Sequence, residues 1–263
     1  MVNKEYLPKT KKWIDKINNM ETKEPTSTGE VLDFKDFRKY SDTFIETGTG
    51  RLGGVYLAID AGFREIKTVE ACENYHNENI RDLTVKFPIN ERFDEHQEVH
   101  FSSQTTFIRL FFGMSQDRLE EMIKYLDKPA VYFVDAHVSG PASAGHEDYM
   151  EKGNDSAYAQ DNVITSELKI ILAHRKDHVI LIDDQNGLND EGKKYIAMIL
   201  EANPNYEFHF YDEKRGDILY KDKCLVCIPK LPLENGDDLP NELFNDEQRK
   251  DLIERVNTIK NKI

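Results

Sequence analysis

Two sequence patterns in this chain indicate a functional site. One is a set of closely spaced glycines beside an acid, and the other is a set of polar side chains that follow apolar runs. The first pattern lies in residues 44–58, where Glu46 precedes Gly48, Thr49 and Gly50. An apolar pair comes before this acid and helix-like apolar spacing comes after the glycines, which predicts a strand, a tight turn and a helix. Glycines let the backbone turn sharply, and the first helix amides point at whatever occupies the turn. The stretch therefore predicts a ligand-binding turn.

Two further residues extend this pattern. Gly53 is predicted to let the helix sit closely on the strand. Glu70 lies twenty residues after Gly50, at the end of the partly apolar run 66–69. Nucleotide-binding α/β folds place an acid at this distance, where it binds the hydroxyls of a ribose. The spacing therefore favours a nucleotide-like ligand.

Polar residues also follow three later apolar runs. They are Ser115 after 107–112, Asp135 and His137 after 130–134, and Asp183 and Asp184 after 178–182. Ligands of open α/β sheets bind at the carboxyl ends of the strands. We therefore expect these side chains to gather at one edge of a sheet.

The elements that must position these residues alternate along the chain. Strands are expected at 42–45, 66–69, 107–112, 130–134, 178–182, 206–211 and 223–228. Helices are expected at 52–61, 72–83, 117–126, 163–173 and 193–200. This alternation predicts an α/β fold: a Rossmann-like, mostly parallel seven-stranded sheet with helices on both faces and a final antiparallel strand.

The remaining segments are expected to be connections and appendages. Residues 21–30, 86–105 and 138–159 are predicted to be loops, 11–20 a short helix, and the end of the chain from Asp246 a helix that docks or dimerises. The expected organisation is an extension at 1–40, a main domain at 41–230 and a loop with a helix at 231–263.

Composition narrows the class of protein. The 263 residues carry a net charge of −14, which makes nucleic acid an unfavourable partner. No apolar run is long enough to span a bilayer and the N-terminus has no signal-peptide core, so we expect a cytoplasmic protein without a membrane partner. The three cysteines, Cys72, Cys224 and Cys227, are expected to be free thiols, the last two in a buried strand.

Taken together, the residues carry a resemblance to class I S-adenosylmethionine-dependent methyltransferases. The motifs that carry it are 46–50, Glu70, 113–115, 135–137 and 183–184, and it covers roughly residues 42–228. The resemblance implies that the turn with Glu46, Gly48, Thr49, Gly50 and Gly53 holds the methionine part of the cofactor. It also implies that Glu70 binds the ribose, that Ser115 lies beside the adenine, and that Asp135 contributes to the cofactor site.

A dinucleotide-binding domain is the competing interpretation, because Gly48, Gly50 and Gly53 also satisfy its G-x-G-x-x-G pattern. Glu46 distinguishes the two ligands. A carboxylate two residues before the first glycine repels a pyrophosphate, whereas the cationic amino group and sulfonium of S-adenosylmethionine favour an acid nearby. The final antiparallel strand also suits the methyltransferase family.

A second resemblance, to metal-dependent O-methyltransferases that act on sugars of natural products, concerns the acids. It implies that Asp135, Asp183 and Asp184 hold Mg²⁺ or Mn²⁺, since hard cations prefer oxygen ligands. Such a metal binds the substrate and lowers the pKa of the attacking hydroxyl. His137 could then take the proton as general base, and without a metal His137 and Asp135 would serve as base and orienting acid.

The expected function is therefore methyl transfer from S-adenosylmethionine to a hydroxyl of a sugar or other small polyol, free or within a glycan. A nicotinamide (NAD)-dependent oxidoreductase and a non-catalytic cofactor-binding module are the alternatives. A homodimer is possible through the apolar stripe of the C-terminal helix.

Overall fold

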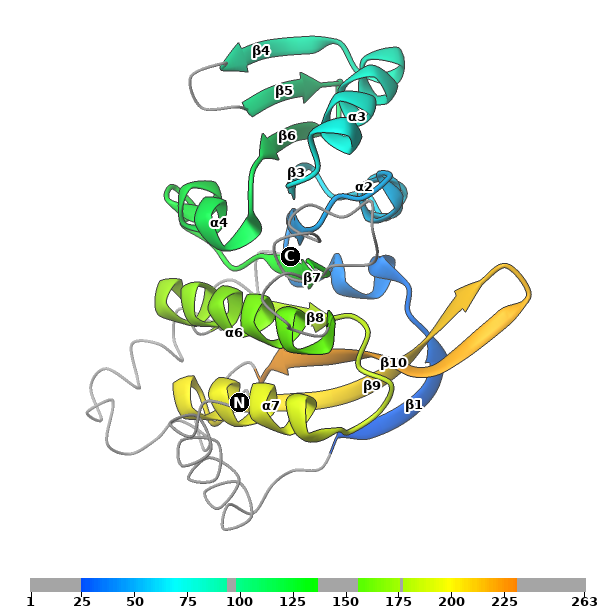
Figure 1. Cartoon of the computed structure of the whole chain (residues 1–263), viewed down its shortest axis with the longest axis vertical. Coiled ribbons are helices and arrows are strands. Elements are labelled where there is room, and N and C mark those ends of the chain that lie inside the picture. Colours follow the sequence, from blue (N-terminus) through cyan, green and yellow to red (C-terminus); the bar gives the residue numbers. More distant parts are fainter. Residues whose placement is uncertain (1–24, 94–97, 137–155, 176, 231–263) are drawn as a thin grey trace, which may run out of the picture. The chain divides into compact units, whose positions relative to one another are not determined.

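The computed structural model describes residues 25–93, 98–136, 156–175 and 177–230 (Figure 1). By its internal contacts the chain divides into Met1–Ile228 and Pro229–Ile263. Apart from Pro229 and Lys230, all described residues belong to the first unit. The helix expected at 11–20, most of the loop expected at 138–159, His137 and the C-terminal helix lie outside the described residues.

One sheet of ten strands forms the centre of the first unit. Its strands are β1 Thr26–Val31, β2 Thr43–Thr47, β3 Glu65–Glu70, β4 Ile89–Phe93, β5 Glu98–Ser102, β6 Phe107–Phe112, β7 Val131–Val134, β8 Val179–Ile182, β9 Tyr206–Arg215 and β10 Ile218–Pro229. Their order across the sheet is β1-β9-β10-β8-β7-β2-β3-β6-β5-β4. The helices are η1 Phe34–Phe37 (a 3-10 helix), α2 Gly53–Asp60, α3 Glu73–Lys86, α4 Ser115–Ile123, α6 Ser156–His174 and α7 Asp190–Ala202.

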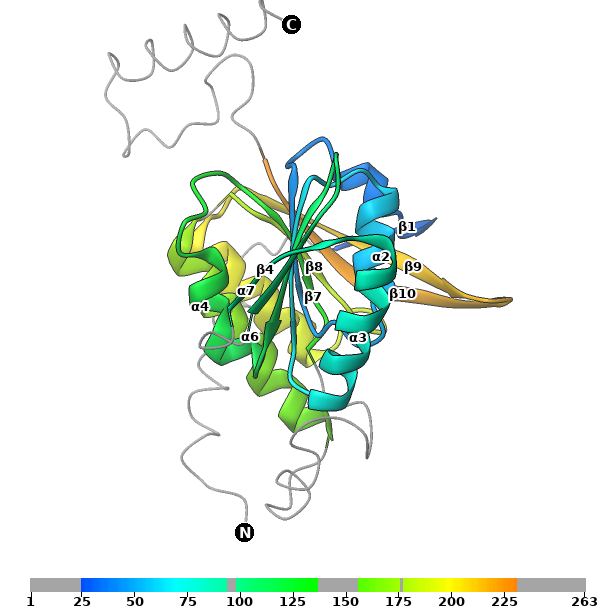
Figure 2. The ribbon, with the colours of Figure 1, turned by 90° about the horizontal axis from the view of Figure 1, so that it is seen from above.

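The centre of the sheet is parallel. Strands β6, β3, β2, β7 and β8 are parallel neighbours, and β10 runs antiparallel to β8. A turn at Gly216 joins β9 to β10, which are neighbours in the sheet. Figure 2 shows α4, α6 and α7 on one face of the sheet and α2 and α3 on the other. The prediction of an α/β fold with a mostly parallel core and an antiparallel C-terminal hairpin is confirmed, whereas the antiparallel strands β4 and β5 at the other edge were not predicted.

The predicted number of seven strands is wrong, because two segments expected to be loops contain three further strands. Two of them, β4 and β5, lie within 86–105. The charges that suggested a surface loop there satisfy one another on the sheet: Glu98 Oε1 accepts from Arg109 Nε at 2.6 Å and contacts His100 Nε2 at 2.5 Å. Val99 and Phe101 of the same strand face the core.

The third missed strand is β1, which begins within the loop expected at 21–30 and ends one residue beyond it. It pairs in parallel with β9, and Thr28 Oγ1 donates to the Phe210 carbonyl at 3.0 Å. Most of its side chains are exposed. An edge strand held mainly by its backbone leaves no apolar pattern by which the sequence could reveal it.

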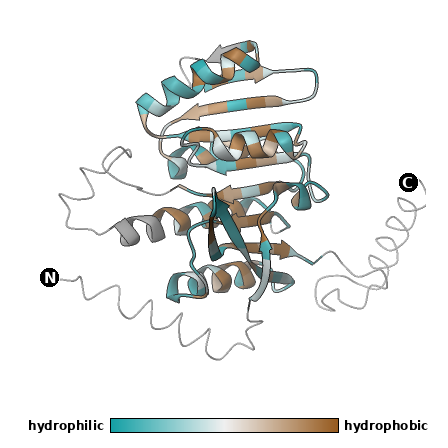
Figure 3. Cartoon of the chain, turned by 90° about the vertical axis from the view of Figure 1, so that its right-hand side faces the viewer, coloured by the Kyte–Doolittle hydropathy of each residue, from teal (hydrophilic) through white to brown (hydrophobic). Residues whose placement is uncertain are grey.

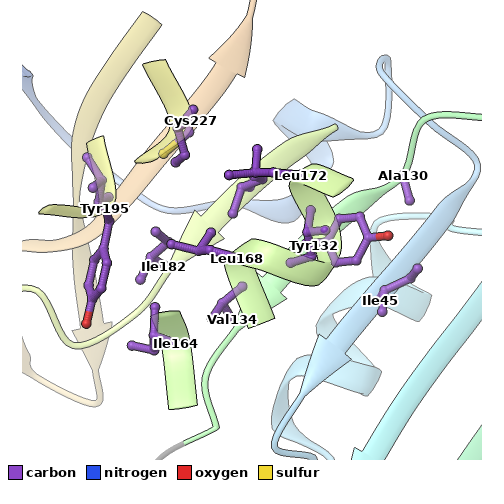
Figure 4. Close-up of a cluster of buried hydrophobic side chains, with 14 of the residues drawn as sticks. Ile45, Ala130, Tyr132, Val134, Ile164, Leu168, Leu172, Ile182, Tyr195 and Cys227 are labelled. Atoms are coloured by element: carbon purple, nitrogen blue, oxygen red, sulfur yellow. The ribbon is translucent and has the colours of Figure 1, made fainter. Parts of the chain in front are cut away.

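Two apolar cores lie on opposite faces of the sheet. The α6-face core contains the side chains that α4, α6 and α7 bury against alternate residues of the strands, including Ile45, Tyr132, Val134, Leu168 and Ile182 (Figure 4). The α2-face core contains the other alternation of the same strands with η1, α2 and α3. Figure 3 shows the hydrophobic colour on the strands between these helices. Burial on both faces is the reason that the parallel strands read as continuous apolar runs.

Cys224 and Cys227 are buried free thiols in β10, as the sequence predicted. In the part of the chain that the structure describes, no helix is long and apolar enough to cross a membrane.

The amino end of β8 contains a buried histidine that makes stability depend on pH. His178 Nδ1 accepts a hydrogen bond from the Ala130 amide at 3.0 Å, and the ring packs edge-on against Tyr132. The side chain is fully buried, and this burial lowers its pKa from 6.5 to about 4. The folded protein therefore holds His178 neutral at pH values where the unfolded chain protonates it.

We expect His178 to cost the protein about 3 kcal/mol of unfolding free energy as the pH falls from 6.5 to 4, because only the unfolded state gains a proton there. His178→Gln keeps an acceptor for the Ala130 amide but does not titrate. Urea unfolding of both proteins at several pH values measures the difference. Parallel pH dependence of the two proteins would contradict this assignment.

Candidate functional site

The strand order reverses between β2 and β7. The chain runs from β2 outward through β3 to β6, then returns to β7 and β8 on the other side. Open α/β sheets bind ligands at the carboxyl ends of the strands at such a point. Here the ends of the two strands touch closely: a Cβ on Gly48 would lie 2.8 Å from the Asp135 carbonyl oxygen. Gly48 also has a φ of +92°, so any other residue would be both strained and too large.

Backbone hydrogen bonds hold the glycine turn after β2. The amides of Gly48 and Thr49 donate to the Val69 carbonyl at 3.1 and 3.0 Å. Glu70 accepts from the Gly50 amide at 2.8 Å and from the Cys72 amide at 2.7 Å. The turn predicted from the sequence is therefore tied to the end of β3.

Asn79 of α3 contacts this turn, and sequence reasoning missed it. Its side chain is buried, and Nδ2 donates to the Gly50 carbonyl at 3.0 Å. A buried asparagine in a polar helix gives no sequence signal of its own, because its neighbours are polar as well.

Glu46 places a buried carboxyl beneath the turn, on the α2 side. It accepts from Thr68 Oγ1 at 2.8 Å, and Thr68 Oγ1 lies 2.6 Å from Thr49 Oγ1. Burial raises the pKa of Glu46 well above its usual range, and the nearby charges of Asp135 and Glu70 raise it further. Burial also raises the pKa of Glu70, which its backbone hydrogen bonds partly offset. The turn is thus surrounded by carboxyl groups whose ionisation a positive charge would favour.

The close approach of helix to strand occurs at Gly54, whereas the sequence assigned it to Gly53. A Cβ on Gly54 would overlap Glu46 Oε1, while a Cβ on Gly53 would meet nothing within 4 Å. The correction has a simple cause: the helix begins at Gly53, so its second residue is the one that faces β2.

We expect Gly54→Ala to lower the unfolding free energy by about 1–3 kcal/mol, because the new methyl group displaces the buried Glu46 carboxyl from Thr68. The matched variant Gly53→Ala should be neutral or stabilising by up to about 1 kcal/mol, since alanine favours the helix. Urea denaturation of both variants tests the pair, and equal stabilities would contradict the assignment of the close contact to Gly54.

The acids after β7 and β8 are partly brought together. Burial raises the pKa of Asp183 to about 7, and the charge of Asp135 raises it next most. Arg215 Nη2 of the hairpin lies 3.8 Å from Asp183 Oδ2. Asp184 instead forms an ion pair with Lys223. Among the described residues, no group of three or more His, Cys, Asp or Glu side chains could hold a metal ion.

Ser115 is the first residue of α4, and its side chain is buried against α6. There it meets Glu167, a fully buried acid that sequence reasoning missed. Glu167 lies three residues after Ile164 and four before Ile171, so it occupies the apolar stripe of its helix. That position is a signal from which the sequence could have revealed it. His137, the predicted base, lies outside the described residues.

No protein-family model matches this chain, and no curated protein matches its sequence. Several solved structures, however, are similar to this chain. An O-methyltransferase from Bacillus cereus in complex with SAH (S-adenosylhomocysteine) is 14% identical, with a TM-score of 0.44 over 84% of this chain and 90% of the other.

Two further similar structures are TomG and a putative caffeoyl-CoA O-methyltransferase. TomG, an O-methyltransferase from Streptomyces achromogenes in complex with SAM, is 12% identical, with a TM-score of 0.45 over 86% and 90%. The putative caffeoyl-CoA O-methyltransferase from Staphylococcus aureus is 11% identical, with a TM-score of 0.41 over 84% and 99%. Likenesses this distant support no function by themselves, so the function must follow from the residues of this chain.

Proposed function

We propose that this protein is a methyltransferase that uses S-adenosylmethionine to methylate a hydroxyl group of a sugar or other small polyol. The observation that carries the proposal is the set of buried carboxyl groups around the glycine turn at the switch point. Burial raises the pKa of Glu46 and of Glu70, and the charges of Asp135 and Glu70 raise that of Glu46 further, so a cationic ligand is favoured there. The donor supplies such a cation together with a methyl group on its sulfonium.

The turn supports this ligand better than a dinucleotide. A pyrophosphate binds at the first amides of a helix, where the positive end of the helix dipole attracts it. In this chain the Glu46 carboxyl lies against Gly54, in the first turn of α2. A phosphate at that place would raise the pKa of Glu46 still further, whereas a cation favours the ionised carboxylate and is attracted by it.

Glu70 is our proposed ligand of the ribose. Its two oxygens accept backbone hydrogen bonds from Gly50 and Cys72, and the backbone of Ala71 also hydrogen-bonds to the carboxylate. A carboxylate has about four lone-pair sites, so Glu70 retains acceptor capacity for the ribose. The glycine turn with Thr49 would hold the methionine part, and Ser115 would lie near the adenine.

For the acceptor side we propose Asp135 and Asp183 as the acids that face the reacting hydroxyl, with His137 as the base. The three-carboxylate metal site of the sequence analysis does not assemble in the described residues, since Asp184 is paired with Lys223. A divalent metal therefore remains a proposal that depends on Asp135 and Asp183 alone. The cytoplasmic location and the homodimer also stay predictions.

A transfer assay tests the function. The protein is incubated with donor carrying a labelled methyl group and with three acceptor sets: neutral sugars and polyols, phenols, and glycans. Each set is run with and without a divalent cation. We expect label on a hydroxyl of the first or third set; label on phenols alone would contradict the acceptor class. Absence of transfer by a protein that binds the donor product would favour a non-catalytic binding module.

A further inference from the structure

Glu167 is an acid placed where the fold has no structural need of one. It lies on α6, on the stripe that packs against the sheet with Ile164, Leu168 and Ile171. Its side chain is fully buried. Figure 4 shows the neighbours Ile164 and Leu168 pointing into the α6-face core. A leucine or methionine here would bury apolar surface without the cost of removing a carboxyl group from water.

The contacts of Glu167 reach three strand ends. Its Oε2 accepts a hydrogen bond from Thr47 Oγ1, at the end of β2, at 3.1 Å. Thr47 Oγ1 in turn lies 3.3 Å from the amide of Asp135, which donates to it at the end of β7. Ser115, the first residue after β6 and its Gly113–Met114 bend, also hydrogen-bonds to the carboxyl group.

These contacts join the two segments that the proposed function assigns to opposite ends of the donor. Thr47 precedes the glycine turn, on the methionine side, and Ser115 begins the segment on the adenine side. A single buried carboxyl group on α6 thus fixes both segments relative to each other. Since preorganised sites need side chains that hold their contacts in place, this arrangement suits a site that must bind an extended ligand.

We propose that Glu167 is a positioning residue for the methyl donor, which braces the β2 and β6 segments of the donor site through the hydroxyls of Thr47 and Ser115. The proposal rests on the proposed function, because the two segments are donor-binding only if that function holds. Glu167 touches neither the donor nor the acceptor in this scheme. Burial, which raises its pKa to about 8, is consistent with a neutral carboxyl that hydrogen-bonds rather than a charge that attracts the ligand.

Two measurements on the full chain test the proposal: the Kd for SAH, by titration calorimetry, and the melting temperature. Glu167→Met removes the hydrogen bonds but fills the same space. We expect it to raise the Kd for SAH about tenfold, the value of one lost hydrogen bond, while the melting temperature stays equal or rises. Glu167→Gln keeps an acceptor for both hydroxyls and should restore the Kd to within about threefold of the parent.

Two controls separate positioning from a general effect on the core. Lys67→Met removes another buried ionisable side chain on the same face, at the middle of β3, where Lys67 Nζ donates to the Met122 carbonyl. This variant should leave the Kd for SAH unchanged. Thr47→Val removes the hydroxyl that Glu167 accepts from, together with its contact to the Asp135 amide, so in combination with Glu167→Met the two losses should be less than additive.

Unchanged SAH affinity in a folded Glu167→Met would overturn the proposal. So would a fall in affinity that follows a fall in melting temperature, since that is the mark of a structural role alone. A Glu167→Gln variant as weak as Glu167→Met would overturn it as well. If the unaltered protein itself fails to bind SAH, the proposed function falls and the positioning role with it.

Discussion

Replacing Glu70 with alanine should weaken SAH binding by about a hundredfold or more, because it removes the acceptor that we propose for the ribose. A hydrogen bond to a charged group contributes about 1.5–3 kcal/mol, and the ribose loses at least one. The same change also leaves the amides of Gly50 and Cys72 without their acceptor, which loosens the glycine turn. Titration calorimetry measures the affinity, and circular dichroism confirms that the variant is folded.

The matched control for this prediction is Glu73→Ala. Glu73 is an exposed acid in the first turn of α3, three residues after Glu70, and no backbone amide of the turn depends on it. Its replacement should leave the affinity unchanged, which separates the specific contact from the general loss of one negative charge. A folded Glu70→Ala variant with the affinity of the parent protein would exclude Glu70 from the site.

The second large effect should come from Asp183. Asp183→Asn is expected to abolish detectable methyl transfer while SAH affinity stays within about threefold, since we propose that Asp183 faces the acceptor rather than the ribose. If Asp183 and Asp135 hold a divalent cation, the Asn variant loses it because an amide carries no charge to hold the ion. A chelator, which removes the ion, should then have the same effect on the unaltered protein. Steady-state transfer and calorimetry measure the two properties separately.

Asp184→Asn is the control, because Asp184 is paired with Lys223 and lies outside the proposed acid pair. This variant should keep its transfer activity. Full activity in the presence of a chelator would end the metal proposal and leave His137 with Asp135 as base and orienting acid. Full activity of Asp183→Asn would remove Asp183 from the acceptor site altogether.

The sequence revealed those parts of the fold in which local pattern and tertiary environment agree. The five parallel strands are buried on both faces, so each reads as an apolar run with a polar residue after it. Because the carboxyl ends of such strands share an edge, the nearness of the glycine turn, Glu70 and Asp135 followed from chain order, although Glu46 lies within β2 and not after it. These are also the residues on which the proposed function rests.

The predictions from the sequence were wrong where contacts between residues distant in the chain determine the structure. Strand β5 holds Glu98 and His100 beside Arg109 of β6, and no local pattern distinguishes this arrangement from a charged loop. The close contact was predicted at Gly53 but occurs at Gly54, because a shift of one residue at the start of a helix changes which residue faces the strand. Glycine spacing alone does not specify that rotation.

Glu167 and Asp184 are opposite examples within the candidate site. The sequence contains Glu167 as an acid in an apolar helical stripe, which is a recognisable signal. Its partners Thr47 and Ser115, however, come from segments far away in the chain. Asp184 followed a strand as a metal ligand would, but the neighbouring strand β10 provides Lys223 to pair with it. In both cases the pairing across the sheet, which the sequence does not contain locally, determines the role.

The most direct test of the central claim is calorimetric titration of the full chain with SAH and, separately, with NAD. The acidic glycine turn predicts saturable one-to-one binding of SAH that is weakened in Glu70→Ala, and no binding of NAD at the same concentrations. Binding of NAD without binding of SAH would contradict the account, because it would mean that the turn accepts a pyrophosphate despite the buried carboxyl of Glu46.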